Sequence, residues 1–269
     1  MTDRRLSPNP ELITQKTPAQ IIVPVTDLDR SPTGPRDRQA LYGEMLTVLD
    51  RVNGSAYVQL TKDSYCGYVN ETAIGPVTTP THVVTAPATH AYAHADLKSP
   101  DVSALSFGSR VAVTQTEGRF AQTALGYIPT QHLAPLPHHF SDPAAVAEMF
   151  LGTPYLWGGN SRRGIDCSGL VQAAFLACGI PCPGDSDQQQ SSFADPVPDS
   201  SHIPRDIRRN DLLFWKGHVA LVLDPTTMIH ANAHHMAVTR EPVQDALTRI
   251  AKIDGPLTGH KRLSPSKWA

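Results

Sequence analysis

The chain has 269 residues, of which 40% are hydrophobic and 18% are charged, and its formal net charge is -2. These values are typical of a soluble globular protein and leave room for one large domain or for two or three small ones. The sequence contains no long basic run, which excludes nucleic acid and an anionic membrane as expected partners.

Residues 1–20 are polar and rich in proline, and they predict a tail or a segment that wraps around the next domain. The pair Arg4-Arg5 is not followed by the apolar core of about 7–15 residues that a secretory signal needs. The sequence also lacks an apolar run of about 18 residues, the length that a membrane-spanning helix needs. With Met1 as the natural start, we therefore expect a cytoplasmic protein.

Between residues 21 and 137, short apolar runs are separated by glycine, proline, aspartate and threonine, which predicts short strands joined by turns. A loose repeat of about 55–60 residues runs through this region, a length that suits a small barrel. Each copy ends on Gly-Tyr and a β-branched residue, at Gly67-Tyr68-Val69 and at Gly126-Tyr127-Ile128. We predict two tandem all-β SH3-like barrels, residues 21–77 and 78–137, with one irregular β domain as the alternative.

The remaining residues, 138–269, predict an α+β domain. Asp142 suits the N-cap of a helix with Pro143 at its first position. A second helix is expected between Cys167 and Cys178, because apolar residues recur there at helical spacing. Beyond Asp211 the pattern changes to that of strands, which points to a helical half followed by an antiparallel sheet.

The four cysteines are Cys66, Cys167, Cys178 and Cys182, too few for a disulfide scaffold in a chain of this length. Cys178 and Cys182 are close in sequence, but they lack the second cysteine or histidine pair that a four-ligand zinc site needs. We therefore expect small buried thiols there and no metal.

Cys167 is the predicted nucleophile, because it falls in the first turn of a helix, where free N–H groups and the helix dipole favour a thiolate and an oxyanion. A nucleophilic cysteine needs a base, and the base needs an orienting partner. His218 opens one predicted strand and His230 ends the next, so antiparallel pairing can bring them together. We predict His218 as the base and His230 as its partner, with His234 and His235 exposed in a turn.

These motifs resemble those of the NlpC-type cell-wall peptidases, a circularly permuted branch of the papain-like cysteine peptidases. The resemblance covers about residues 141–255 and lies in "PYLWGGNSRRGIDCSGLV", "GDSDQQ", "DLLFWKGHVALVLD" and "MIHANAHHMAV". It implies hydrolysis of the bond between γ-D-Glu and a diamino acid, meso-diaminopimelate or Lys, in murein tripeptides and tetrapeptides. It implies further roles for Tyr155 in the oxyanion hole or in substrate orientation, for Trp157 in the pocket wall, and for Asp166 and Ser168 in binding γ-D-Glu.

The whole chain looks similar to one subgroup, in which SH3-like barrels precede the peptidase domain and the substrate must carry a free N-terminal L-Ala. That similarity implies that Asp185, Ser186, Glu44 and Tyr65 bind the amine, although Tyr68 competes with Tyr65 for the last position. It also implies an enzyme that recycles cell-wall peptides, and we expect a monomer. No cofactor is expected, since Cys–His chemistry needs none.

Two other functions remain open at the level of sequence. In the first, the barrels bind the cell wall and the chain acts on intact murein, or the peptidase domain is inactive. In the second, the same fold serves an acyltransferase or amidase, because both reactions also pass through a thioester.

Overall fold

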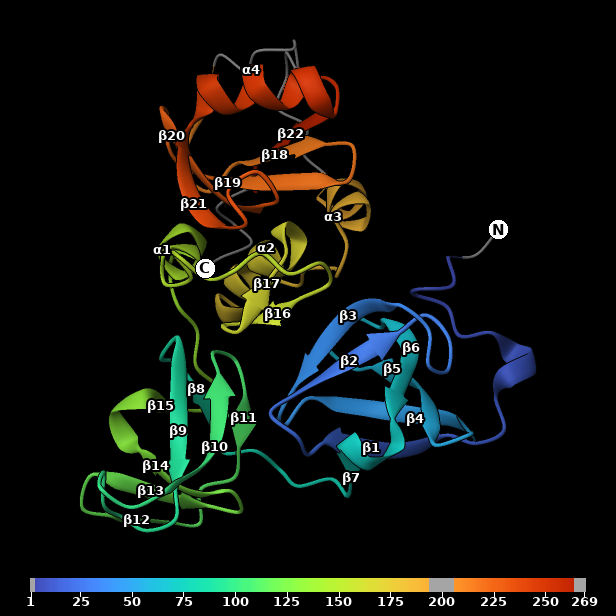
Figure 1. The fold of residues 1–269 in the computed structure, drawn as a ribbon, viewed down its shortest axis with the longest axis vertical. Helices are drawn as coiled ribbons and strands as arrows, with labels where there is room; N and C mark the ends of the chain where they lie inside the picture. Colours follow the sequence, from blue (N-terminus) through green and yellow to red (C-terminus); the bar gives the residue numbers. More distant parts are fainter. Residues whose placement is uncertain (1–2, 194–205, 264–269) are drawn as a thin grey trace. The chain divides into compact units, whose positions relative to one another are not determined.

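The computed structural model describes residues 3–193 and 206–263. These residues form two compact units, which appear in Figure 1. The chain passes from the first unit to the second between His138 and His139, and Asn160–Arg162 group with the first unit. Among the described residues, no helix is both long and apolar enough to span a membrane.

The first sheet of the first unit has seven strands in the order β3-β2-β6-β5-β4-β1-β7. Neighbouring strands pair antiparallel, and their inward side chains, such as Leu28, Val48 and Val58, form one apolar core. The strands are β1 (Thr17–Ile21), β2 (Val25–Asp29), β3 (Arg36–Leu41), β4 (Met45–Val52), β5 (Ser55–Leu60), β6 (Cys66–Asn70) and β7 (Ile74–Gly75).

The N-terminal segment follows this sheet. The amide of Cys66 donates to the carbonyl of Arg5 at 2.7 Å, and the amide of Asn9 donates to the hydroxyl of Tyr57 at 3.1 Å. A 3-10 helix, η1 (Pro10–Leu12), follows the Asn9 cap, and then β1 pairs with β4. Residues 3–13 of the segment predicted as a tail or wrap therefore wrap around the sheet. Its last residues, from Thr17 on, belong to the sheet itself.

Two smaller sheets make up the rest of the first unit, in the orders β10-β9-β14-β13-β12 and β11-β8-β15. They enclose a separate core that contains Val84, Ala91, Leu105 and Ile128. The strands are β8 (His82–Val84), β9 (Ala88–Tyr92), β10 (Asp101–Ser106), β11 (Arg110–Val111), β12 (Gln115–Glu117), β13 (Phe120–Thr123), β14 (Gly126–Pro129) and β15 (Leu133–Pro135).

The loose sequence repeat has the same local structure in both copies. In the first, β6 leads into a 3-10 helix, η2 (Glu71–Ala73), and then into β7. In the second, β14 leads into η3 (Thr130–His132) and then into β15. The strand, helix and strand thus recur where Gly-Tyr and a β-branched residue recur in the sequence. The division of the unit into two SH3-like barrels stays a prediction.

The second unit places helices on both faces of a five-stranded antiparallel sheet with the order β21-β20-β19-β18-β22. The strands are β18 (Leu212–Trp215), β19 (His218–Asp224), β20 (Thr227–Asn232), β21 (Ala237–Pro242) and β22 (Gly259–Lys261). The helices are α1 (Pro143–Glu148), α2 (Cys167–Ala177), α3 (Ser186–Ser192) and α4 (Val243–Ile253), and the loop before α2 contains the two-residue strands β16 (Asn160–Ser161) and β17 (Gly164–Ile165).

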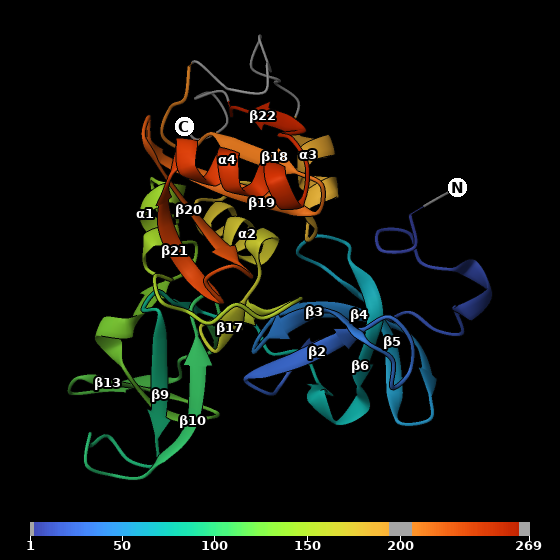
Figure 2. The same ribbon diagram turned by 45° about the horizontal axis from the view of Figure 1, so that its top comes forward.

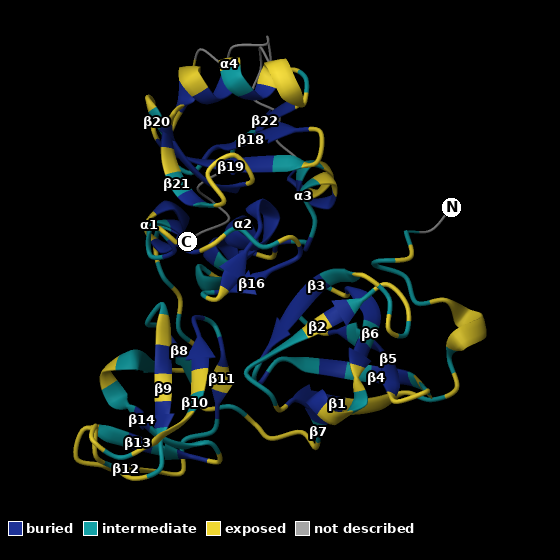
Figure 3. Cartoon of the chain, in the orientation of Figure 1, coloured by how far each residue is buried: buried dark blue, intermediate teal, exposed yellow. Residues whose placement is uncertain are grey.

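Helices α1 and α2 lie on one side of this sheet and α4 on the other (Figure 1), and Figure 2 shows α4 across β18 and β19. Leu247 and Ile250 of α4 pack on Leu213, Ala220 and other apolar side chains of the sheet. Figure 3 shows the difference between the helices, since α2 is buried along most of its length while α4 has an exposed outer side. Helix α2 is therefore the central helix of the unit.

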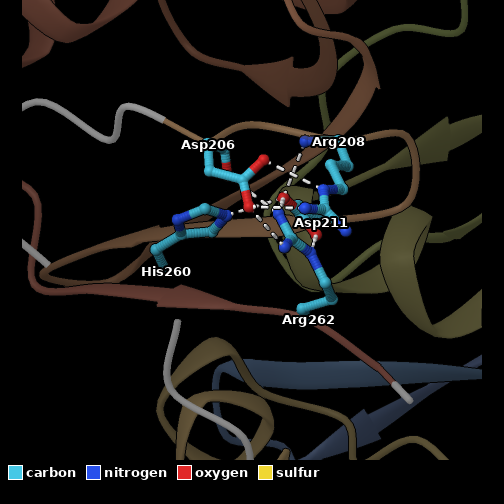
Figure 4. Close-up of polar contacts among 5 residues, drawn as sticks. All are labelled: Asp206, Arg208, Asp211, His260 and Arg262. Carbon is cyan, nitrogen blue, oxygen red and sulfur yellow. Dashed lines mark hydrogen bonds and ion pairs between the residues drawn. The ribbon is translucent and has the colours of Figure 1, made fainter. Parts of the chain in front are cut away.

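A buried ionic cluster fixes the last strand, β22, to the start of β18 (Figure 4). The carboxylate of Asp211 accepts from Nε of Arg262 at 2.7 Å, from Nη2 of Arg262 at 2.7 Å and from Nε2 of His260 at 2.7 Å. The amide of Arg208 donates to the same carboxylate at 2.8 Å, and Asp206 binds the outer side of Arg262. Asp211 and His260 are each 1% exposed, so the centre of the cluster is part of the interior.

Candidate active site

Cys167 is the first residue of α2, as the sequence predicts, and it is buried. Asp166 caps the helix, because its carboxylate accepts from the amide of Gly169 at 2.6 Å and from the Ser168 hydroxyl at 3.1 Å. It also accepts from the amide of Gly158 at 2.9 Å, which ties the preceding loop to the helix. Asp166 and Ser168 thus hold the backbone around the nucleophile, and their predicted contact with γ-D-Glu stays a prediction.

The loop before α2 can approach the helix this closely only because Gly169 has no side chain. A Cβ atom on Gly169 would lie 2.5 Å from the carbonyl oxygen of Gly159, which is far inside van der Waals contact. A larger residue at Gly169 would therefore push the loop away from the turn that carries Cys167.

The two predicted histidines are in direct contact. Nε2 of His218 lies 2.9 Å from Nδ1 of His230, on the neighbouring strand. Leu221 pairs with Ile229, so the two histidines are diagonal neighbours rather than directly opposite each other. The ring of Trp215 packs against that of His218 with a centroid distance of 5.7 Å, and α2 packs against β19 and β20. The structure thus brings the predicted base and its predicted partner together on the two strands that pack against the helix of Cys167.

Two residues that the sequence analysis missed extend this pair. Nε2 of His230 lies 3.0 Å from Oε2 of Glu241, on β21. Arg249 of α4 donates to both oxygens of Glu241, from Nε at 2.9 Å and from Nη2 at 2.7 Å. Glu241 follows Thr239, the residue paired with His230, by two positions. The sequence therefore shows a carboxylate on the strand after His230. Whether that carboxylate reaches His230 depends on the pairing register of β20 and β21.

Burial keeps both histidines neutral. It lowers the pKa of His218 to about 3, and electrostatic interaction with His230 and Arg249 lowers it further. It also lowers the pKa of His230, against the attraction of the Glu241 carboxylate. Burial opposes the ionisation of Glu241, but the hydrogen bonds from His230 and Arg249 outweigh it and bring the pKa of Glu241 down to about 2. At neutral pH the group therefore consists of two neutral imidazoles and one ion pair.

Tyr155 lies near the nucleophile in the loop before α2. Burial raises its pKa well above 10, and electrostatic interaction with Cys167 and Asp166 raises it further. Its hydroxyl therefore stays protonated and is a hydrogen-bond donor at neutral pH, as an oxyanion or orienting role requires. Trp157 is 67% exposed, and its predicted place in the pocket wall stays a prediction.

Asp185 and Ser186 stand at the start of α3, where Asp185 is the N-cap and its amide donates to Oε1 of Gln188 at 3.4 Å. Gln189 of the same helix links α3 to the catalytic helix. Its side-chain amide donates to the carbonyl of Ser168 at 2.9 Å and to that of Pro183 at 3.0 Å. The helix that Asp185 caps is therefore tied, through Gln189, to Ser168, the residue after Cys167.

Glu44 and Tyr65 belong to the first unit. Oε1 of Glu44 accepts from Nζ of Lys62 at 2.7 Å. Tyr65 is 1% exposed and belongs to the apolar core of the first sheet, whereas Tyr68 is half-buried and packs on Tyr57. The predicted roles of Glu44 and Tyr65 in binding the substrate amine stay predictions. His234 and His235, in contrast, are exposed in the turn between β20 and β21, as predicted.

The neutral histidines predict a pH-dependent stability. In the unfolded chain a histidine takes up a proton below about pH 6.5, whereas His218 and His230 resist it when folded. We therefore expect the free energy of unfolding to fall as the pH drops below about 6.5, by up to about 1.4 kcal/mol per pH unit for each histidine. Glu241 adds a loss in the same direction below about pH 4.5, which is complete near pH 2.

Denaturant unfolding followed by tryptophan fluorescence measures this slope. All three tryptophans, Trp157, Trp215 and Trp268, follow residue 138 in the sequence. His230→Gln is expected to reduce the slope, while the exposed control His234→Gln leaves it unchanged. An equal slope in all three proteins would contradict the assignment of neutral, buried histidines.

Comparisons with known proteins identify two domains in the chain. Residues 152–251 match the model of the NlpC/P60 family, and residues 28–74 match that of the bacterial dipeptidyl-peptidase Sh3 domain. The chain is 34% identical over 125 residues to dipeptidyl-peptidase 6 from Lysinibacillus sphaericus, a match that covers 44% of this chain and 44% of that protein. It is 35% identical over 94 residues to gamma-D-glutamyl-L-lysine dipeptidyl-peptidase from Bacillus cereus, covering 32% and 26%.

The matches thus span less than half the length of these curated relatives. The fold is similar over a longer stretch to the crystal structure of an NlpC/P60 family protein from Bacillus cereus. That likeness has a TM-score of 0.76 at 21% sequence identity and covers 93% of this chain and 100% of the other. At this identity it shows the shared fold.

Proposed function

Because residues 152–251 form an NlpC/P60 peptidase domain and residues 28–74 a bacterial dipeptidyl-peptidase SH3 domain, we propose that the protein is a cysteine peptidase of murein peptides. It hydrolyses the bond between γ-D-Glu and a diamino acid in peptides that begin with a free L-Ala. The observation that carries the proposal is a cysteine at the start of α2 in the same unit as the hydrogen-bonded His218 and His230. The relatives named as dipeptidyl-peptidases support the choice of bond.

In the proposed reaction, His218 takes the proton of the Cys167 thiol, and the sulfur attacks the carbonyl carbon at the γ position of D-Glu. The C–N bond then breaks, the amine of the diamino acid takes the proton from His218, and a thioester remains on Cys167. A water molecule attacks the thioester while it gives a proton to His218, and the C–S bond breaks as that proton returns to the sulfur. The protonated hydroxyl of Tyr155 is suited to stabilise the oxyanion of both tetrahedral intermediates.

The test is to incubate the full chain with L-Ala-γ-D-Glu-meso-diaminopimelate, and separately with the L-Lys analogue, and to measure the free diamino acid. Release of either diamino acid supports the proposal, and release of neither contradicts it. Soluble fragments from intact sacculi would instead indicate a wall hydrolase. Transfer of the acyl group to an added amine in place of water would indicate an acyltransferase.

The proposed requirement for a free amine gives a separate prediction. N-acetylation of the L-Ala is expected to lower kcat/KM by at least about 100-fold. The resulting amide has no positive charge and can no longer form an ion pair with a carboxylate. Asp185→Asn, which removes the charge but keeps a good N-cap, is expected to raise KM for the free peptide by about tenfold or more. Asp187→Asn, on the exposed side of the same helix, is the matched control and should leave KM unchanged. Equal rates for the acetylated and free peptides would rule out amine recognition.

A specificity for free amines suits peptides that have been released from the wall. We extend the proposal to the recycling of such peptides in the cytoplasm. Fractionation of the native cells, with detection of the protein by an antibody, checks this part.

A further inference from the structure

We infer that Glu241 is a positioning residue that determines which nitrogen of His218 is free to accept a proton. It acts through His230, and Arg249 holds it in place. The inference comes from three consecutive contacts in the second unit, His218 to His230, His230 to Glu241, and Glu241 to Arg249. It rests on the proposed function only in taking Cys167 as the source of the proton.

The assignment of protons starts at Glu241. Its two oxygens receive two N–H groups of Arg249, and an ionised carboxylate can only accept hydrogen bonds. The guanidinium keeps the carboxylate ionised, in line with the lowered pKa of Glu241. The nitrogen of His230 that faces it, Nε2, must therefore carry a hydrogen and donate it to Oε2 over the 3.0 Å between them.

The same logic then passes through His230 to His218. A neutral imidazole has one N–H and one bare nitrogen, so Nδ1 of His230 is bare and accepts. The atom that lies 2.9 Å from it is Nε2 of His218, which must carry a hydrogen and donate it. His218 is neutral as well, so its other nitrogen, Nδ1, is the bare one. The carboxylate of Glu241 thus makes Nδ1 of His218 the proton acceptor, although the two side chains are separated by a whole imidazole ring.

Arg249 fixes Glu241 from a different element. Glu241 lies on β21 and Arg249 on α4, and the two hydrogen bonds define both the position and the orientation of the carboxylate. Glu241 is 9% exposed, so water does not compete freely for these lone pairs. The packing of α4 on the sheet therefore helps to orient the catalytic base, because Arg249 positions Glu241.

Replacing Glu241 with glutamine removes this directionality. The amide has the same shape but can turn either its oxygen or its NH2 group toward Nε2 of His230. With the NH2 group in that position, every hydrogen in the series reverses, and Nδ1 of His218 then carries a hydrogen and cannot accept one. We expect Glu241→Gln to lower kcat by about 100-fold or more with little change in KM, as a wrong tautomer of a catalytic histidine does.

The direct test is nitrogen NMR of the full chain labelled with 15N-histidine at pH 7, which separates protonated from bare ring nitrogens. The wild type is expected to show His218 with hydrogen on Nε2 and His230 with hydrogen on Nε2. A wild-type spectrum with hydrogen on Nδ1 of His218 would overturn the inference, without any variant having to fold. In Glu241→Gln the Nδ1-protonated form of His218 should appear, and an unchanged spectrum would also overturn it.

Two measurements separate this result from a failure of the proposed function. The rate at which iodoacetamide alkylates Cys167 needs no peptide, and it should fall in Glu241→Gln and recover in Glu241→Asp, which restores the charge. The control is Glu148→Gln, which breaks another carboxylate–arginine pair of the same unit, the pair with Arg240. Loss of alkylation in both variants would indicate a merely structural effect. If the histidines have the expected tautomers but no peptide is cleaved, the proposed function fails and the inference stands.

Discussion

Cys167→Ala is expected to abolish peptide cleavage, with kcat/KM reduced by at least about 10⁴-fold. The reason is that alanine cannot form the thioester, and the two histidines cannot replace a missing nucleophile. The measurement is release of the diamino acid from L-Ala-γ-D-Glu-diamino acid under conditions in which the wild type is active. Thermal unfolding should change little, because the variant keeps the Asp166 cap and loses only one sulfur atom.

The matched control for this variant lies at the other end of the same helix. Cys178 is a free, half-buried thiol at the C-cap of α2, and burial raises its pKa to about 11, which makes it a poor nucleophile. Cys178→Ala should therefore keep most of the activity. Cleavage that survives Cys167→Ala, or that disappears in Cys178→Ala, would show that the nucleophile has been assigned to the wrong cysteine.

Asp211→Asn is expected to have the largest effect on stability, a loss of about 3 kcal/mol in the free energy of unfolding. The carboxylate is held in its ionised form, because hydrogen bonds from Arg262, His260 and the Arg208 amide outweigh the burial that would raise its pKa. An asparagine has one acceptor oxygen in place of two and carries no charge. The variant would leave at least one buried donor of Arg262 or His260 without an acceptor (Figure 4).

Denaturant unfolding followed by tryptophan fluorescence measures this loss, and Asp206→Asn is its control. Asp206 also binds Arg262, with a distance of 3.0 Å from Nη1, but its side chain is 53% exposed. An exposed ion pair contributes about 1 kcal/mol or less. We therefore expect Asp206→Asn to be nearly neutral. Equal losses in the free energy of unfolding for the two variants would mean that burial does not determine how much each carboxylate stabilises the fold.

Several elements of the second unit could be predicted because their signals are local. Asp142 and Asp166 are the cap residues directly before α1 and α2, and Asp142 caps its helix as the sequence analysis predicts. The short apolar runs beyond Asp211 predicted β18 to β21, and the order of motifs singled out Cys167, His218 and His230. Local signals were also overlooked, since Val243, Ala246, Leu247 and Ile250 form the apolar stripe of α4.

Other parts depend on contacts that no local pattern encodes. Helix α3 is polar along its length, and Gln189 finds its partners only through the position of α2. The first strand begins at Thr17, inside a segment that looks like a tail, because pairing with β4 decides its start.

The sequence by itself determined the helix that begins at Cys167 and the two strands that carry His218 and His230, because cap residues, periodicity and short motifs act over a few neighbouring positions. Only the tertiary structure decided that Glu241 and Arg249 complete the histidine pair and that Asp211 binds Arg262, 51 residues further along the chain. The physical reason is the same in both cases. A buried carboxylate finds its partners through strand register and helix packing, and these are set by the whole domain.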